Sequence, residues 1–168
     1  MKFFQERLTS RHNSDDFSSG NHQLDAWLRS AALTADRAGT GRTFVWINDE
    51  EEVVAFFTLA PHVVRRTELP KRLGHGSPDS IPCLLVARIA LHQSFHGQGL
   101  GAQLLVEALR TSLSAMKTAG GRLIVVDAVD KAAASFYEHH GFRRMPENPY
   151  RLFLKASDAA KSLDLAWP

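Results

Sequence analysis

Apolar residues recur every three or four positions in three stretches of the chain, a spacing that places them on one face of a helix. The first stretch covers residues 22–38, with charged residues on the other faces. The second runs from the leucine pair at 104–105 to the glycines at 120–121, and the third covers residues 131–140. The pattern predicts three helices, each followed by glycine, which is a common residue after a helix end.

Short runs rich in β-branched and aromatic residues lie between these helices and indicate strands. We expect strands at residues 3–8, 43–47, 53–60, 84–91 and 123–128, and a closing hairpin formed by residues 142–145 and 151–154. Residues 61–82 contain prolines, glycines and two basic pairs, which predict a long loop, and long loops are often functional. Strands and helices in this order indicate a mixed α/β sheet.

Three glycines at alternate positions follow the apolar strand at residues 84–91. Gly97, Gly99 and Gly101 allow a tight turn that aims several backbone N–H groups at one point, at the start of a helix, and this arrangement suits a phosphate. No Lys-Ser or Lys-Thr follows the glycines, which argues against a Walker loop, and the position past mid-chain argues against a dinucleotide-binding fingerprint. The alternative is a simple turn that starts a helix.

Composition and charge narrow the class of protein. With 168 residues, 44% of them hydrophobic and 23% charged, the chain fits a single globular domain over residues 1–168. A net charge of +2 does not by itself indicate a nucleic-acid-binding protein. The only cysteine, Cys83, excludes an internal disulfide framework and a multi-cysteine zinc site. The first 19 residues lack a signal-peptide core and no apolar run could span a bilayer, so we expect a cytoplasmic protein.

The apolar strand, the glycine loop and the sequence Ala133–Phe142 together resemble the GNAT superfamily of N-acetyltransferases. The acyl-CoA loop of this family reads Q/R-x-x-G-x-G/A; Gly99 and Gly101 match it, and His96 stands where Gln or Arg is usual. The resemblance implies an α/β (α+β) GNAT fold, in which helices flank a mixed, mostly antiparallel central sheet, with acetyl-CoA as cosubstrate.

The resemblance also implies roles for particular residues. Backbone amides from Gln98 to Ala102 would hold the CoA pyrophosphate, and the strand edge at Ile89–Leu91 would pair with the pantetheine arm. The implied acid for the departing thiolate is Tyr137, and a backbone N–H near Leu91 would bind the acetyl carbonyl. The expected cofactor-binding residues are Ile89, Ala90, Leu91, His96, Gly97, Gln98, Gly99, Leu100, Gly101, Ala102 and Phe136. Without the resemblance, Tyr137 would be read as a core tyrosine beside Phe136.

A narrower likeness covers nearly the whole chain and includes Phe17-x-x-Gly20, Leu24-Asp25-x-Trp27-Leu28, Gly39-Thr40-x-Arg42 and Ala87-Arg88-Ile89-Ala90. These segments are similar to the TacT and AtaT type of GNAT toxins. The likeness implies acetylation of the α-amino group of aminoacyl-tRNA, which blocks translation. It also implies a ribbon-helix-helix antitoxin as partner and a homodimer.

The chemistry of the acceptor agrees with an α-amine. An α-amino group has a pKa of about 7.7–8.0 and is partly neutral at cellular pH, whereas a lysine, at about 10.4, needs a strong base. The strand at residues 84–91 carries no carboxylate, and the orientation of Asp127 on the next strand is open from sequence. The mild preference is therefore for an α-amine, with deprotonation through water.

Basic residues supply candidates for contacts with tRNA. The expected substrate-binding residues are Arg42, Arg65, Arg66, Arg88 and Arg143, and Arg29, Arg37, Lys71, Arg72 and Arg144 are further candidates. The alternative for any single one is an ordinary solvated charge. Arg88 interrupts an apolar strand, so it either pairs internally or faces the acceptor. The eight histidines show no metal-ligand spacing, and no metal is expected.

Two other functions remain open at this point. An acetyltransferase of a small metabolite or antibiotic amine would use an acidic acceptor pocket and would have little affinity for tRNA. A regulatory module that binds acyl-CoA without catalysis would have no reason to keep Tyr137.

Overall fold

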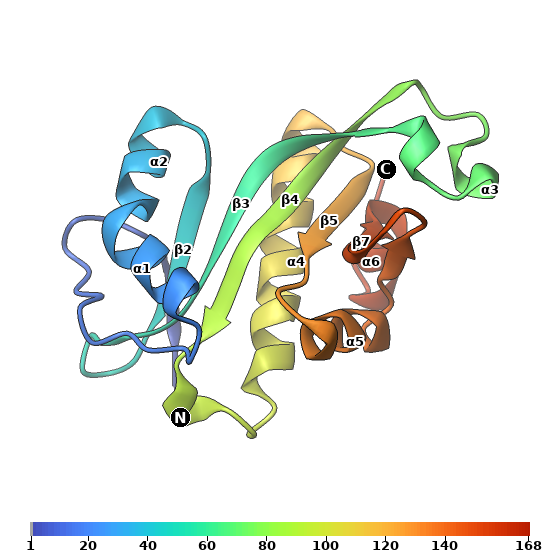
Figure 1. The fold of residues 1–168 in the computed structure, drawn as a ribbon. Helices are drawn as coiled ribbons and strands as arrows, with labels where there is room; N and C mark the ends of the chain where they lie inside the picture. The colour runs from blue at the N-terminus through green and yellow to red at the C-terminus, as the bar shows by residue number, and fades with distance from the viewer. Residues whose placement is uncertain (1) are drawn as a thin grey trace. The chain divides into compact units, whose positions relative to one another are not determined.

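The computed structural model describes residues 2–168, in which seven strands form one sheet in the order β1-β2-β3-β4-β5-β7-β6 (Figure 1). The strands are β1 (Phe4–Arg7), β2 (Arg42–Ile47), β3 (Val53–Arg65), β4 (Ser80–Leu91), β5 (Leu123–Asp127), β6 (Arg143–Met145) and β7 (Asn148–Lys155). Strand β4 pairs with β5 in parallel, whereas β1 with β2, β2 with β3, β5 with β7 and β6 with β7 are antiparallel. The prediction of a mixed, mostly antiparallel sheet with helices is confirmed.

The helices are α1 (His22–Ser30), α2 (Ala32–Ala38), α3 (Lys71–Gly74), α4 (Leu100–Ala119), α5 (Lys131–His139) and α6 (Ala156–Ser162). Two short 3-10 turns, η1 (Arg66–Glu68) and η2 (Gln93–Phe95), complete the elements. Across residues 2–168, no helix combines the length and the apolar character that crossing a bilayer requires.

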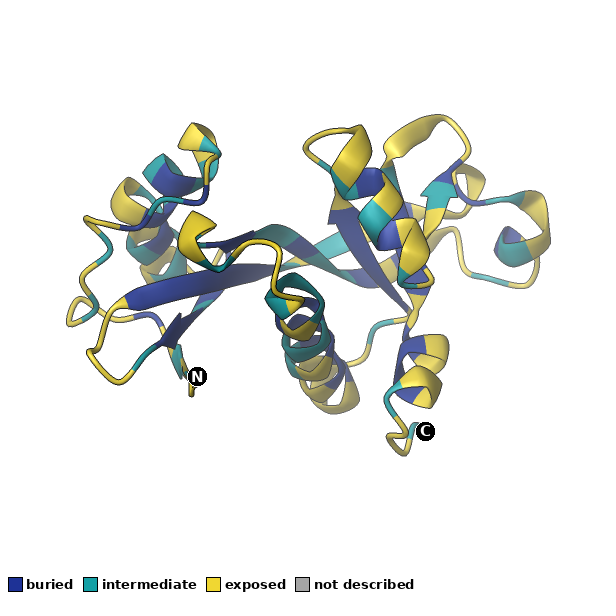
Figure 2. Cartoon of the chain, turned by 90° about the horizontal axis from the view of Figure 1, so that it is seen from below, coloured by how far each residue is buried: buried dark blue, intermediate teal, exposed yellow. Residues whose placement is uncertain are grey.

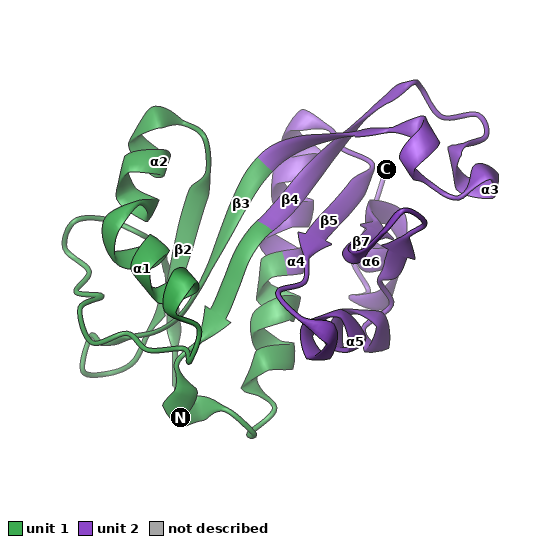
Figure 3. Cartoon of the chain, in the orientation of Figure 1, with its two compact units in different colours: residues 1–60, 87–108 green, residues 61–86, 109–168 purple. Residues whose placement is uncertain are grey.

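Two compact units divide the chain (Figure 3). Unit 1 contains the residues up to Ala60 together with 87–108, and unit 2 contains residues 61–86 and 109–168. Each unit has its own core. In unit 1, α1 and α2 pack against β2 and β3 through a cluster that includes Leu28, Ala32, Val45 and Phe56. In unit 2, a cluster that includes Ile81, Val125, Met145 and Phe153 joins β4, β5, β6 and β7.

Buried residues lie along the strands that hold these cores, while the helices carry exposed residues on their outer faces (Figure 2). Val53–Leu59 of β3 is buried at every position, as expected for a strand that is covered on both faces. The one polar residue of this run, Thr58, is 2% exposed, and its hydroxyl is hydrogen-bonded to that of Thr43 at 2.8 Å.

The predicted helix at residues 22–38 is two helices, so the prediction of a continuous helix was wrong. Ala31 leaves the helical region with φ −125° and ψ −24°, and α2 begins after it without a side-chain cap. Ala32 is fully buried in the unit 1 core. Tertiary packing of Ala32 thus overrides a local pattern that continues through the break.

The predicted long loop at residues 61–82 was also wrong, because most of it is ordered secondary structure. Strand β3 continues to Arg65, η1 and α3 follow, and β4 begins at Ser80. Val64 is 1% exposed and its neighbours point outward, which is the alternation of a half-buried strand. Helix α6, where Ala156, Ala159 and Ala160 are buried, was missed by the sequence reading.

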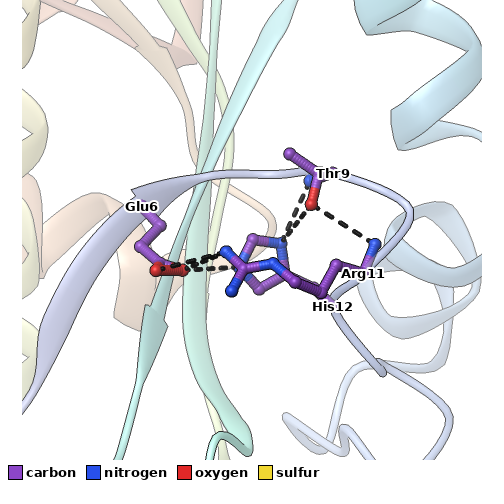
Figure 4. A network of polar contacts seen from close by, with 4 residues as sticks. All are labelled: Glu6, Thr9, Arg11 and His12. Atoms are coloured by element: carbon purple, nitrogen blue, oxygen red, sulfur yellow. Dashed lines mark hydrogen bonds and ion pairs between the residues drawn. The ribbon is translucent and has the colours of Figure 1, made fainter.

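A polar network fixes the chain just after β1 (Figure 4). The His12 ring, whose side chain is 4% exposed, has its Nε2 atom 2.9 Å from a carboxylate oxygen of Glu6, and its Nδ1 atom accepts from the backbone N–H of Thr9 at 3.0 Å. Arg11 donates to the same carboxylate at 3.1 Å. These partners, His12 first, hold the pKa of Glu6 below its usual range.

Asp36 near the end of α2 joins three elements of unit 1. Its carboxylate accepts from Arg7 of β1 at 2.7 Å and lies 3.4 Å from Arg42 of β2, and Arg42 also donates to the Asp36 carbonyl. The hydrogen bond from Arg7 holds the pKa of Asp36 below its usual range, and the Asp36 side chain is only 11% exposed.

Replacing this carboxylate tests how far unit 1 depends on it. We expect Asp36→Asn to lower the free energy of unfolding by about 1–2 kcal/mol at neutral pH. Since the carboxyl has a lower pKa in the folded than in the unfolded chain, the stabilisation is present above about pH 4 and is lost as the pH falls through the folded pKa. Urea unfolding of both proteins at falling pH measures this. The control is Asp49→Asn on an exposed turn, and a difference that stays constant in acid contradicts the assignment.

Candidate active site

The glycine loop joins the carboxyl end of β4 to α4. After Leu91 the chain makes the turn η2 and then enters the left-handed region at Gly97, with φ +77°, and again at Gly99, with φ +78°. Side chains with a Cβ atom rarely adopt this backbone, so both positions require glycine. The sequence pattern of alternate glycines is explained by these two turns.

The space beside the glycine loop is open. At Gly97, Gly99 and Gly101 no heavy atom lies within 4 Å of the place that a Cβ atom would occupy. The first N–H groups of α4 have no partner inside the helix, and the helix dipole is positive at this end. A phosphate group could therefore approach the backbone closely, so the residues present fit the pyrophosphate of CoA.

Hydrogen bonds from neighbouring residues fix the loop. Nε2 of His96 donates to the Leu91 carbonyl at 2.8 Å, which ties the start of the loop to the end of β4. Gln93 donates to Ser18 twice, from its backbone N–H at 2.8 Å and from its side chain at 3.2 Å. His96, which replaces the usual Gln or Arg of the family motif, therefore still holds the loop in one conformation.

The last residues of β4 extend beyond its pairing with β5. The register pairs run from Cys83 with Leu123 to Val86 with Val126, and Ile89–Leu91 lie further along β4. Ala90 and Leu91 are each 8% exposed. The edge that was predicted to pair with pantetheine therefore lies past the last β5 partner.

Tyr137 lies in α5, in unit 2. Its side chain is 5% exposed and its ring contacts Phe136 and Phe142 at centroid distances of 5.5 and 5.6 Å. Burial, with a smaller contribution from the charge of Asp127, raises the pKa of Tyr137, so the phenol is protonated at neutral pH. The hydroxyl has no hydrogen-bond partner among residues 2–168. In that range every fully buried side-chain oxygen has a hydrogen-bond partner. Since the Tyr137 hydroxyl has none, it is not fully buried and remains accessible to solvent.

A three-residue array that the sequence reading missed lies in the same unit. Arg151 of β7 donates to both carboxylate oxygens of Asp127 on β5, at 2.7 and 2.8 Å, and its third contact is with Nε2 of His62 at 3.1 Å. Burial and the Arg151 charge lower the pKa of His62. Asp127 is therefore held in an ion pair. The signal was the register that sets Asp127 opposite Arg151, which requires knowledge of the strand pairing.

The predicted substrate-binding arginines occupy different environments. Arg42 is tied to Asp36, and Arg66 pairs with Asp79 at 2.8 Å. Arg65 is exposed, and Arg143 lies 5.8 Å from the centre of the Phe153 ring. Of the site residues, Arg42, Arg88 and the strand and loop residues from Ile89 to Ala102 belong to unit 1. The others, Arg65, Arg66, Phe136, Tyr137 and Arg143, belong to unit 2.

Arg88 is half-buried on β4 and does not pair with a carboxylate. Its guanidinium carbon lies 4.2 Å from the centre of the Trp27 ring on α1, and burial lowers the pKa of Arg88. The Trp27 ring in turn stacks on Phe56, with centroids 6.3 Å apart and planes 18° apart. Of the two alternatives left open by the sequence, the internal ion pair is not found among residues 2–168.

Comparison with known proteins places this geometry in a family. The acetyltransferase (GNAT) domain family matches residues 40–144. A tRNA-acetylating toxin of Mycobacterium tuberculosis is 35% identical over 91% of this chain and 92% of its own length. A probable toxin TacT of Sinorhizobium fredii is 27% identical over 86% of each chain.

Solved structures of the AtaT toxin share the fold. AtaT complexed with acetyl-methionyl-tRNA superposes with a TM-score of 0.86 at 26% identity, over 97% of this chain and 98% of that one. A mutant of AtaT bound to the C-terminus of its antitoxin superposes with a TM-score of 0.81 at 23% identity, over 95% of this chain and 97% of that one.

A single methyl group at the loop tests its predicted role. We expect Gly99→Ala to weaken the binding of acetyl-CoA about tenfold or more, because the Cβ atom would project into the open space beside the backbone. The matched control is Gly39→Ala at the end of α2, where φ is +77° and the space is also open. Both variants carry a similar left-handed backbone strain of about 1–2 kcal/mol. Calorimetric titration with acetyl-CoA measures the difference, and equal losses of affinity contradict the role of the loop.

Proposed function

This chain belongs to the GNAT family of acetyltransferases, and we propose that it acetylates the α-amino group of aminoacyl-tRNA and so acts as a toxin that blocks translation. The family transfers acetyl groups from acetyl-CoA to amines, so the chain is an acetyl-CoA-dependent N-acetyltransferase. The observation that carries the proposal is the match, along 91% of the chain, to a tRNA-acetylating toxin.

The charged groups of the chain support an α-amine acceptor. Arg88 is the only charged residue of β4, and Asp127 of the next strand is committed to Arg151. Neither strand therefore offers a free carboxylate to deprotonate a lysine. An α-amine, with a pKa of about 7.7–8.0, supplies its own neutral fraction at cellular pH.

The proposed mechanism assigns one task to each group of residues. Backbone amides from Gln98 to Ala102 bind the pyrophosphate of acetyl-CoA, which supplies the acetyl group as a thioester. The neutral amine forms a C–N bond to the acetyl carbonyl carbon, and a backbone N–H near Leu91 donates to the carbonyl oxygen as it gains negative charge. The C–S bond breaks, Tyr137 protonates the departing thiolate, and the amine loses its proton to water.

The wider assignments belong to the same proposal. Arg65, Arg88 and Arg143 contact the tRNA, and Phe136 contacts the cofactor. Arg42 and Arg66 contact the tRNA by exchanging their partners Asp36 and Asp79 for phosphate. The catalytic domain spans residues 1–168 and acts in the cytoplasm, where charged tRNA is found. The relatives are toxins, and AtaT is solved with its antitoxin, which supports an antitoxin partner. We propose an antitoxin of the ribbon-helix-helix class and a homodimeric enzyme.

Direct transfer of label tests the function. We expect labelled acetyl groups to pass from acetyl-CoA to a pool of charged tRNA and not to uncharged tRNA or free amino acids. Separation of the labelled tRNAs identifies the amino acids that are accepted. Label on free amines alone, with charged tRNA untouched, would establish the acetyltransferase of small amines instead.

Removal of one hydroxyl tests the general acid. We expect Tyr137→Phe to reduce kcat by about 100-fold or more and to leave acetyl-CoA affinity nearly unchanged, since the ring contacts remain. Tyr150→Phe removes the only other tyrosine hydroxyl, which is exposed, and is the matched control. Because the pKa of Tyr137 is raised above its ordinary value of about 10, the wild-type rate should show no fall from loss of this acid up to about pH 10. Unchanged turnover in Tyr137→Phe would falsify the assignment.

A further inference from the structure

Arg88 differs from the other half-buried arginines of unit 1 and unit 2 in its lack of an acceptor. Arg144 pairs with Glu138 at 2.8 Å and Arg151 with Asp127 at 2.7 Å. The Arg88 side chain has no hydrogen bond or ion pair among residues 2–168, and its guanidinium lies over the face of Trp27. A half-buried guanidinium without a protein acceptor keeps its N–H donors available, so its place in the fold suits a ligand that supplies oxygen acceptors.

Trp27 holds the Arg88 guanidinium in place. The Trp27 ring contacts both the guanidinium and Phe56, and because Phe56 is fully buried, the aromatic support cannot move freely. Contact with a ring face stabilises the positive charge, but it leaves the five N–H donors of the guanidinium without an oxygen acceptor from the protein. A guanidinium held this way suits two oxygens of one anion, as in phosphate recognition.

The alternation of β4 relates Arg88 to the rest of the strand. Arg88 and Ala90 point to the same face, and Ala90 belongs to the core cluster beneath α1 and α2. Ile89, the residue between them, begins the edge assigned to pantetheine in the proposed function. Arg88 therefore directly precedes the segment of β4 that carries the acetyl donor in that proposal.

We propose that Arg88, supported by Trp27, binds the phosphate that precedes the terminal adenosine of the aminoacyl-tRNA. This inference rests on the proposed function and identifies the part of the substrate that the residue contacts. In an aminoacyl ester the carboxylate is blocked, so the nearest anion to the reacting amine is this phosphate. A free amino acid would offer its carboxylate instead, and the two sources of oxyanion can be separated by experiment.

The experiment compares two small analogues of the acceptor end. Both are 3′-aminoacylamino-3′-deoxyadenosines that carry an amino acid accepted on tRNA, and only one bears a 5′-phosphate. We expect the wild-type protein, with acetyl-CoA bound, to bind the phosphorylated analogue about tenfold or more tightly. Arg88→Met should remove this preference, and Arg88→Lys should restore only part of it, because an ammonium lacks the two-pronged geometry.

The controls separate binding from folding. Arg7→Met removes an arginine of the same unit that is paired with Asp36, and it should keep the full preference for the phosphorylated analogue. Trp27→Phe keeps a ring under Arg88 and should reduce the preference without abolishing it. A general loss of structure would weaken both analogues equally, so the ratio of the two dissociation constants reports on the phosphate alone.

The outcomes are distinct for the inference and for the proposed function. If charged tRNA is acetylated but the wild type binds both analogues equally, or binds neither, the role of Arg88 is overturned. The same holds if Arg88→Met keeps the preference. If charged tRNA is not acetylated and free amino acids bind through their carboxylate in an Arg88-dependent manner, the proposed function fails and the oxyanion is that carboxylate.

Discussion

A strand in the middle of a sheet, with a neighbouring strand on each side, offers polar chemistry only at its ends or where a polar residue interrupts its apolar sequence. Strand β4 does both. Its carboxyl end passes through η2 into the left-handed turns at Gly97 and Gly99, and the hydrogen bond from His96 to the Leu91 carbonyl holds that passage in place. Its one charged residue, Arg88, packs against the Trp27 ring and has no counter-ion among residues 2–168. The packing of the sheet thus restricts the polar groups of this strand to the places where a ligand could meet them.

The arrangement of the other charges supports this view of Arg88. Arg7 and Arg42 share Asp36, Arg11 pairs with Glu6, Arg66 with Asp79, Arg144 with Glu138 and Arg151 with Asp127. Ion pairs at an exposed surface stabilise the fold only weakly. Here they mainly show which arginines already have a carboxylate partner within the protein. Arg66 is committed, whereas Arg65 beside it is exposed. A basic residue counted in the sequence is therefore a candidate for tRNA contact only after its partners are known.

The sequence indicated the elements that depend on local pattern and missed those that depend on pairing. The glycine loop, helix α4 and the closing hairpin followed from glycine spacing and apolar periodicity. The break at Ala31 did not, because the periodicity continues through it and only the burial of Ala32 reveals the turn. The strand character of Pro61–Arg65 was hidden by proline and arginine residues, which usually indicate a loop. The orientation of Asp127 depended on the register that sets it opposite Arg151.

The proposed role of Tyr137 shows why a core residue and a catalytic residue need not be alternatives. Its ring packs against Phe136 and Phe142, which fixes the direction of the phenol and excludes water from most of the side chain. That burial disfavours the phenolate, and the nearby charge of Asp127 acts in the same direction, so the proton stays on the oxygen at neutral pH. The two hydrogen bonds from Arg151 to the Asp127 carboxylate partly offset that charge. A hydroxyl that keeps its proton, has a fixed direction and has no protein acceptor among residues 2–168 is suited to donate to a thiolate that forms only during the reaction.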